Sequence, residues 1–592
     1  MRQTIATGIA ALLAATAAHA ATSGTFTGRV RDSAGVAVAG AMVSATHPQA
    51  RRTTTVYSGN DGRFTFPPLD IGVYDVRVRR IGFQDLVLAG AVLGGGPAHL
   101  DLRVDAETDP QALAWQLPAS RWVPLLLAEL SSDAHREEFL RQCAYCHQQG
   151  SWATRVPRSA ADWDKILTLM GRMGGIVSSG LRAELPRAFN RAYADPAYLQ
   201  TLTPVHVVPP LDAAAAAVIT EWDLGESAST QHDLAVHPDG TIYSVDTNQD
   251  KLYRLDPRTN QRWSYDIPRG NSPLGGIFGS SGTLLAPNSN AHVAPHSLQV
   301  AADGSIWVTL CLGNKIGRFD PQTERWDIIE QEDGLYPHTL RFDHKGRIWY
   351  TLAVSNHVGM YDPQTGQRGT VRLPARDWKQ ALTLRLTPYL LPLTRYISPD
   401  RLAGSEGVTL PVPYGIDIAP DGGVWFSQLN ERRIGRIDPD LGTIEMVDTP
   451  FSAPRRMRFD SKGNLWIAGF SAGVVARYDP VGKHFDTWKI PTDGVETPYA
   501  LNVDRRTDTV WICGTNSDSL ISFDPHTEQF TIYPLPTRVT YTREIDFDAD
   551  GGVWTSNSNF PTWQIEAPNP KVIRIQPGAA PHIEQVAAAG DA

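Results

Sequence analysis

Residues 295–321 read PHSLQVAADGSIWVTLCLGNKIGRFDP, and the same pattern returns in residues 337–363, PHTLRFDHKGRIWYTLAVSNHVGMYDP, and in residues 413–439, PYGIDIAPDGGVWFSQLNERRIGRIDP. Each copy holds short apolar runs separated by a turn rich in Asp and Gly, with an aromatic residue after the turn. That aromatic position recurs at Tyr243, Trp307, Trp349, Trp425, Trp466, Trp511 and Trp554. Most intervals are 41–45 residues, which is room for four short strands and is typical of a propeller blade. The seven copies predict a seven-bladed β-propeller over residues 217–592.

Two intervals in the repeat are longer, 64 and 76 residues. They predict insertions at about 269–294 and 371–410. The ring also has to close. Either the strand VITEWDL, residues 218–224, pairs with the last blade, or HIEQVA, residues 582–587, completes that blade itself; the sequence leaves both open.

The length and composition describe a globular chain of several domains. It has 592 residues, 42% hydrophobic and 20% charged, with 50 glycines and 16 tryptophans. This favours turns and aromatic-packed strands over a helical bundle. The net charge of −9, with no basic tract to offset it, argues against a nucleic-acid-binding protein.

The first 20 residues, MRQTIATGIAALLAATAAHA, have the pattern of a secretory signal peptide: a basic start, a short apolar run and an Ala-x-Ala site. No later segment is long and apolar enough to cross a bilayer. We therefore expect a periplasmic or secreted protein with no membrane span.

Two further regions precede the propeller. Residues 23–104 alternate apolar and polar positions between Gly, Pro and Asp-Gly turns, which predicts a small antiparallel β-sandwich. Residues 105–130 have the composition of a linker. Residues 131–205 change to helical spacing, with Asp133 as the expected N-cap of the first helix. The fold class is thus mainly β, with a short α-helical region between sandwich and propeller.

The helical region contains the strongest chemical signal, Cys143-Ala-Tyr-Cys146-His147. Cys-x-x-Cys-His is the attachment signature of haem c, in which two thiols bind the porphyrin covalently and the histidine binds the iron. A redox dithiol and a chance pattern are the alternatives, and no second Cys/His pair lies nearby for zinc. Cys311 and Cys513 are expected to be buried as small apolar residues.

The sixth iron ligand is expected from the segment WDKILTLMGRM. A thioether opposite the histidine raises the reduction potential and suits electron transfer. Met170 is the first choice and Met173 the alternative. An iron with an open or histidine-filled sixth position remains a third reading.

A second candidate site follows from the repeat itself. Equivalent positions in successive blades surround the same end of the central channel, and one such position carries only polar, aromatic or charged side chains. The histidines could hold a divalent metal or act as acid–base groups, and the arginines could bind a carboxylate. The alternative is that these side chains only line a wet channel. The predicted ring consists of His232, His296, His338, Tyr414, Arg455, Tyr499 and Arg543.

Two resemblances concern the regions before the propeller. Gly28-Arg29-Val30, Asp61-Gly62-Arg63-Phe64 and Gly72-Val73-Tyr74 resemble the carboxypeptidase regulatory-like domain, which implies a β-sandwich packing module without catalytic residues. The helical region resembles single-haem cytochrome c domains, particularly those of quinohaemoprotein amine dehydrogenases, in which a Trp precedes the ligand Met by seven residues. Trp163 and Met170 have that spacing.

The repeats resemble virginiamycin B lyase (streptogramin lyase) through Pro295-His296, Ile306-Trp307-Val308-Thr309 and Arg433-Ile434-Gly435-Arg436. This resemblance implies a seven-bladed propeller that opens cyclic depsipeptides by elimination with Mg²⁺, His and Glu at the channel mouth. The family's blade ending, Trp-Phe-Thr-Glu, is not kept. The Glu position holds Asp246, Leu310, Leu352, Gln428, Gly469, Gly514 and Asn557. The resemblance therefore implies the fold more strongly than the activity. A ring with few carboxylates also offers few of the oxygen ligands that Mg²⁺ prefers.

Together these observations predict a periplasmic c-type haem protein. In this hypothesis the propeller binds or oxidises a small molecule, and the haem passes electrons to a redox partner protein. Placing both units on one chain fixes their effective concentration. Whether the chain is an enzyme stays open. The alternatives are a metal-dependent lyase or hydrolase of cyclic esters, and a non-enzymatic ligand-binding propeller.

Overall fold

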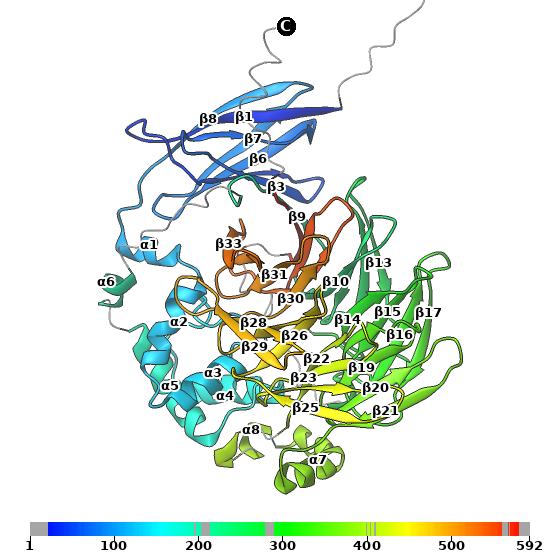
Figure 1. Cartoon of the computed structure of the whole chain (residues 1–592). Helices are drawn as coiled ribbons and strands as arrows, with labels where there is room; N and C mark the ends of the chain where they lie inside the picture. Colours follow the sequence, from blue (N-terminus) through cyan, green and yellow to red (C-terminus); the bar gives the residue numbers. More distant parts are fainter. Residues whose placement is uncertain are drawn as a thin grey trace, which may run out of the picture.

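The computed structural model describes residues 22–194, 197–202, 213–278, 289–397, 399–402, 404–407, 410–558, 566 and 569–578. The predicted signal peptide and the segment HIEQVA lie outside these residues. The chain is mainly β, as predicted, and its three regions follow one another in the order expected (Figure 1).

The N-terminal region is a β-sandwich, which confirms the prediction. One sheet contains β1 (Ser23–Asp32), β4 (Arg63–Thr65), β5 (Leu69–Asp70) and β8 (Pro97–Val104). The other contains β2 (Met42–His47), β3 (Arg52–Tyr57), β6 (Gly72–Arg79) and β7 (Leu86–Leu93). Burial alternates along β1 because successive side chains point to opposite faces of a strand. Phe26, Val30, Tyr74 and Val76 fill the space between the sheets.

Six helices follow. They are α1 (Pro110–Trp115), α2 (Ala119–Ala128), α3 (Asp133–Gln142), α4 (Ala160–Arg172), α5 (Ser179–Ala192) and α6 (Tyr198–Leu202). The prediction of a linker over residues 105–130 was wrong, because α1 and α2 lie there. Trp122 and Leu126 of α2 belong to the same buried core as Phe139 and Leu181. Burial of that apolar face stabilises α2 despite Pro124 in its interior.

Serine side chains mark where three of these helices begin. Ser132, Ser159 and Ser178 each accept a hydrogen bond from a backbone N–H of the first turn. Such N-caps satisfy donors that the helix itself leaves unpaired. The cap of α3 is therefore Ser132, one residue before the predicted Asp133, whose charge instead lies in the first turn.

The propeller has seven four-stranded antiparallel blades. The strands, from the inside outwards, are as follows. Blade one holds β10 (Gln231–Val236), β11 (Ile242–Asp246), β12 (Lys251–Asp256) and β13 (Gln261–Asp266). Blade two holds β14 (Pro295–Val300), β15 (Ile306–Leu310), β16 (Lys315–Asp320) and β17 (Arg325–Glu330). Blade three holds β18 (Pro337–Phe342), β19 (Ile348–Leu352), β20 (His357–Tyr361) and β21 (Arg368–Arg372).

The remaining blades repeat this order. Blade four holds β22 (Pro413–Ile418), β23 (Val424–Gln428), β24 (Arg433–Ile437) and β25 (Ile444–Asp448). Blade five holds β26 (Pro454–Phe459), β27 (Leu465–Gly469), β28 (Val474–Asp479) and β29 (His484–Lys489). Blade six holds β30 (Leu501–Asp504), β31 (Thr509–Gly514), β32 (Ser519–Asp524) and β33 (Gln529–Pro534). Blade seven holds β34 (Thr542–Phe547), β35 (Val553–Asn557), β36 (Lys571–Gln576) and β9 (Val218–Asp223).

The repeated Trp lies on the second strand of its blade and is buried between blades. In three blades its indole N–H has a partner in the preceding turn: Trp349 donates to Asp343 at 2.9 Å, Trp466 to Asp460 at 3.0 Å, and Trp554 to Asp548 at 2.8 Å. A buried indole needs such an acceptor. In these three blades the Trp and the Asp six residues before it satisfy each other.

β9 closes the ring, which settles the choice that the sequence left open for this strand. It pairs with β36 over its whole length, and Trp222 of β9 stacks on Trp554 with ring centroids 5.1 Å apart. The other edge of β9 pairs with β3 of the sandwich. Blade seven and one sandwich sheet thus form a continuous eight-stranded sheet in the order β34-β35-β36-β9-β3-β2-β6-β7.

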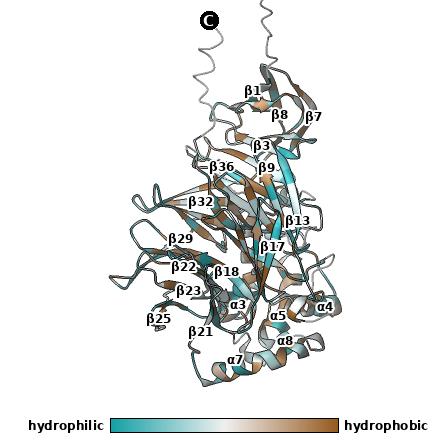
Figure 2. Ribbon diagram, turned by 90° about the vertical axis from the view of Figure 1, so that its right-hand side faces the viewer, coloured by the Kyte–Doolittle hydropathy of each residue, from teal (hydrophilic) through white to brown (hydrophobic). Residues whose placement is uncertain are grey.

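The two predicted insertions lie at one face of the propeller. The first contains η1 (Gly276–Phe278), and the second contains α7 (Trp378–Leu390), η2 (Leu391–Arg395), α8 (Pro399–Leu402) and η3 (Gly404–Glu406). Helices α3 to α5 lie near the same face, and α7 and α8 lie at the end of the molecule opposite the sandwich (Figures 1 and 2). Among the described helices, none has the length and apolarity to cross a membrane.

Candidate functional site

The structure brings all seven predicted ring residues together at the propeller axis. Their rings and guanidinium groups lie in contact and all are buried. The His232 and His296 ring centroids are 3.7 Å apart, those of His296 and His338 3.9 Å, and those of His338 and Tyr414 4.1 Å. Six ring residues lie on the innermost strands β10, β14, β18, β22, β26 and β34, and Tyr499 lies just before β30. The repeat position thus identified a real cluster.

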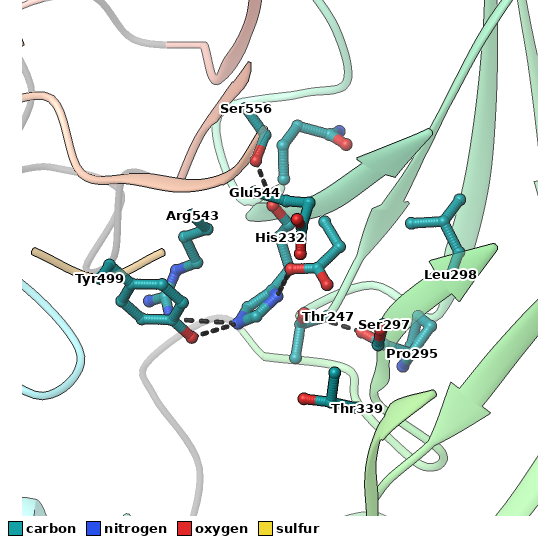
Figure 3. A network of polar contacts seen from close by, with 12 residues as sticks. His232, Thr247, Pro295, Ser297, Leu298, Thr339, Tyr499, Arg543, Glu544 and Ser556 are labelled. Atoms are coloured by element: carbon teal, nitrogen blue, oxygen red, sulfur yellow. Dashed lines mark hydrogen bonds and ion pairs between the residues drawn. The ribbon is translucent and has the colours of Figure 1, made fainter. Parts of the chain in front are cut away.

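Hydrogen bonds close the other half of the ring. Tyr414 donates from its hydroxyl to that of Tyr499 at 2.7 Å, and Arg455 Nη2 donates to Tyr414 at 2.8 Å. Arg543 Nη1 donates to the Tyr499 hydroxyl at 2.9 Å and to His232 Nε2 at 3.1 Å (Figure 3). Because His232 Nε2 accepts, its proton lies on Nδ1, which donates to Asp233 Oδ1 at 2.8 Å.

Burial and neighbouring guanidinium groups set the charge of the ring. Burial, reinforced by Arg543 and Arg456, holds the pKa of His232 well below its ordinary value. Burial also holds the pKa values of His296 and His338 well below the ordinary value. These imidazoles are therefore neutral. Burial alone would raise the pKa of Tyr499, but the surrounding arginines outweigh it and lower that pKa.

A second layer of charged residues lies directly behind the ring, and the sequence analysis missed it. Arg456 Nη2 donates to Asp233 Oδ1 at 2.8 Å, and Arg456 also pairs with Glu544. Arg458 Nη2 donates to Glu544 Oε1 at 2.8 Å. Asp233, Arg456 and Glu544 each follow a ring residue by one position. This recurrence of charge at a second repeat position was the available signal.

One part of this cluster has the composition of a cation site. The ligand atoms of His232, Asp233 and His296 lie within 4.8 Å of one another. Asp233 Oδ2 and His296 Nδ1 are buried and have no hydrogen-bond partner among the described residues. Unpaired polar atoms at such depth are costly and call for a partner such as a water or an ion.

The Cys-x-x-Cys-His segment covers the ring. Tyr541 donates from its hydroxyl to the carbonyl oxygen of Ala144 at 2.6 Å. Arg455 Nη2 donates to the carbonyl of Tyr145 at 3.2 Å, and Arg543 Nη2 donates to that of Cys146 at 2.7 Å. The arginines thus contact the ring and the segment at once. The two candidate sites, which the sequence suggested separately, form one assembly.

The three haem-motif side chains are enclosed at this junction. Cys143 and Cys146 are not joined in a disulfide. Burial raises the pKa of both thiols. Burial lowers the pKa of His147. The Nδ1 atom of His147 lies 3.0 Å from the carbonyl oxygen of Gln148, so Nδ1 carries the proton and Nε2 has the free lone pair.

A mostly apolar cavity of about 370 Å³ adjoins the segment. Three parts of the chain form its wall: the helical region, residues at one end of blades one to four, and both insertions. Met173 lines it, whereas Met170 is not among its described lining residues. The cavity is lined on the helical side by Gln142, Tyr145 and Met173, and elsewhere by Phe278, Leu312, Tyr336, Val412, Leu429, Leu390 and Leu391.

The comparisons with known proteins agree with two of the three regions. Residues 25–105 match the carboxypeptidase regulatory-like domain. Residues 408–561 match the virginiamycin B lyase family. Both resemblances stated from the sequence are thereby confirmed for these segments. No cytochrome c-like match covers the helical region among these family findings, and no curated protein matches the chain.

Three solved structures illustrate the likeness of the propeller. A streptogramin B lyase has 17% identity and a TM-score of 0.47, covering 62% of this chain and 100% of that one. Virginiamycin B lyase from Staphylococcus aureus has 16% identity and a TM-score of 0.46, covering 61% and 99%. Kuenenia stuttgartiensis hydrazine synthase has 13% identity and a TM-score of 0.42, covering 60% and 97%.

Asp246 is the one acidic residue at the family's Glu position, and the hydrogen bonds of its Oδ1 atom are to backbone groups near the end of β11. Asp246 Oδ1 accepts hydrogen bonds from the backbone N–H groups of Thr230, Asn248 and Gln249. It therefore stabilises the turn after β11.

Proposed function

We propose that this chain is an exported haem c protein in which the propeller acts as a rigid platform for the Cys-x-x-Cys-His segment and its cavity binds a small molecule. The supporting observation is the placement of that segment. Its backbone carbonyls are held by Tyr541, Arg455 and Arg543 at the propeller axis, beside an apolar cavity. An electron-transfer group needs such a fixed position relative to a ligand.

The donor set fits haem c. Cys143 and Cys146 are free thiols, and Nδ1 of His147 is held by a backbone carbonyl, as is usual for a metal-binding histidine. Met170 and its alternative Met173 both stay predictions for the second iron ligand, and Met173 lines the adjoining cavity. Bound haem would supply one-electron transfer. The chain's own residues would orient the imidazole and exclude water, and the redox partner stays a prediction.

The test is covalent haem content in protein matured by a host that attaches haem c. We expect sharp bands of the reduced haem in a pyridine haemochrome spectrum and a mass increase of one haem. C143S combined with C146S removes both signals. C513A, which changes a buried thiol in blade six, retains them. Colourless wild-type protein of unmodified mass from the same host would refute the proposal.

Ligand binding by the cavity is tested separately by calorimetry against a library of small apolar and amphiphilic compounds. L429Q places a polar amide in the cavity wall and is expected to weaken binding at least about tenfold. L441Q, at an exposed position of the same blade, is the control.

A metal-dependent lyase or hydrolase is the second candidate, favoured by the unpaired atoms of Asp233 and His296. It predicts ring opening of cyclic esters that requires a divalent cation and is lost in H296A. Its difficulty is access, because the Cys-x-x-Cys-His segment covers the ring. Elemental analysis and turnover assays with Mg²⁺, Mn²⁺ and Zn²⁺ distinguish it from the haem proposal, since C143S would not affect it.

A further inference from the structure

The second insertion exposes an apolar surface that neither candidate site uses. Along α7 and into η2, Trp378, Leu382, Leu386, Tyr389 and Leu393 recur at spacings of three and four residues. Trp378 is 72% exposed and Tyr389 is 77% exposed. At about 100° per residue, these five positions fall on one side of the helix. We call them the α7 stripe.

The opposite side of the same helix is buried. Gln380, Leu384, Thr387 and Leu391 have little exposure, and Thr387 and Leu391 line the cavity. These four residues form the side of α7 that packs on the rest of the protein. The α7 stripe is therefore a second apolar side of the helix, and it is exposed to solvent in the described part of the chain. Tyr396 and Ile397 extend the exposed surface beyond η2.

Charge and residue type indicate what this surface contacts. Residues 376–401 carry five basic and two acidic residues; Arg376 pairs with Glu431 and Arg401 with Asp164 from outside this stretch, which leaves a net charge of +1 in a chain of −9. Arg385 and Lys379 are exposed on either side of the α7 stripe. Trp and Tyr beside Leu, with flanking Lys and Arg, are the composition of helices that lie in the interface of an anionic bilayer.

We propose that the α7 stripe binds the surface of an anionic lipid bilayer. The protein would then associate with the membrane from one side, without spanning it. Helix α7 lies at the end of the molecule opposite the sandwich (Figures 1 and 2), so this binding would leave the sandwich distant from the lipid. This inference is independent of haem attachment.

The experiment is flotation of the full mature chain with vesicles. Vesicles containing phosphatidylglycerol should carry the protein upward, and pure phosphatidylcholine vesicles should carry much less. L382S combined with L386S and Y389S is expected to lower the partition coefficient about tenfold or more. L441S and V481S, which change residues that are 76% and 94% exposed elsewhere, leave it unchanged.

A variant that keeps every apolar residue guards against misfolding. R385E should weaken binding to anionic vesicles several-fold, while circular dichroism and Tm stay as in the wild type. Equal flotation of wild type and triple variant would overturn the proposal, and so would absence of binding to anionic vesicles. Self-association that the triple variant abolishes, with no vesicle binding, would also overturn it and assign the surface to a second copy of the chain.

Discussion

At the residue scale, Arg543 and Arg455 connect the propeller to the helical region. Each guanidinium group lies over the Tyr499 ring and donates both to a ring partner and to a carbonyl of the Cys-x-x-Cys-His segment. Repeat position alone predicted that these arginines face the channel. It could not predict that they bind backbone carbonyls from a different region, because carbonyls leave no pattern in a sequence.

Removing one of these arginines is expected to loosen the segment. In R543M the carbonyl of Cys146 loses its donor and the Nε2 of His232 keeps only the Tyr499 hydroxyl, which should lower the free energy of unfolding by about 1–3 kcal/mol. In protein without haem, alkylation of Cys146 should also become faster. Denaturant unfolding and thiol-labelling rates measure both effects. R506M, at an exposed turn, is the control, and unchanged labelling in R543M would contradict the role given to Arg543.

The neutral histidines predict a pH dependence of stability. Their folded pKa values are lowered, so below about pH 6.5 the unfolded chain binds protons that the folded chain does not. Stability should therefore fall as the pH drops from 7 to 5. H338Q removes one such group and should reduce the loss in that window by about 1 kcal/mol per pH unit. Tm measured against pH tests this, with the exposed H526Q as control; identical slopes would refute it.

At the element scale, the blades were predictable because a buried aromatic residue follows a turn at a regular interval, and in blades three, five and seven that Trp donates to an Asp of the turn. The helices α1 and α2 were not, since Pro118 and Pro124 give residues 105–130 the composition of a linker. Only burial against α3 and α5 reveals why they are helical. The exposed stripe on α7 was also hidden, because a helix that is apolar on two opposite sides shows no single polar side.

The closure strand β9 gives a prediction at this scale. Trp222 is buried and stacks on Trp554 across the β9–β36 pairing. W222A should lower the free energy of unfolding by about 3–5 kcal/mol, since it leaves a cavity where the strand that begins the ring pairs with the last blade. W378A, a substitution of an exposed Trp, should change it by less than about 0.5 kcal/mol. Equal effects of the two changes would argue against closure through β9.

At the scale of the whole molecule, the separate regions behave as one body because their boundaries are bridged by hydrogen bonds. The sandwich joins blade seven through β3 and β9, and Arg79 reaches across to the carbonyl of Pro536 at 2.8 Å. The helical region joins blade six through Ser120, whose N–H donates to the carbonyl of Asn516 at 2.7 Å. The order of the regions could be predicted, but these junctions depend on surfaces that are far apart in sequence.

Such junctions predict a single cooperative unfolding transition for the sandwich and the propeller. A chain that begins at residue 105 should unfold at a lower temperature, because β9 loses one of its two neighbours. Calorimetry of both chains measures this. The substitution T54P in β3, which removes a ladder hydrogen bond near Thr220, should move Tm in the same direction, and two independent transitions in the intact chain would contradict the prediction.

The shared edge between β3 and β9 also bears on the order in which the ring is built as the chain folds. The lysine that pairs with Asp223 of β9 is Lys571, 348 residues further along the chain. Until β36 of the last blade is in place, β9 has no blade to join. β3, already made, offers it a template. The N-terminal domain can thus hold β9 in position until β36, the last strand of the propeller, pairs with it.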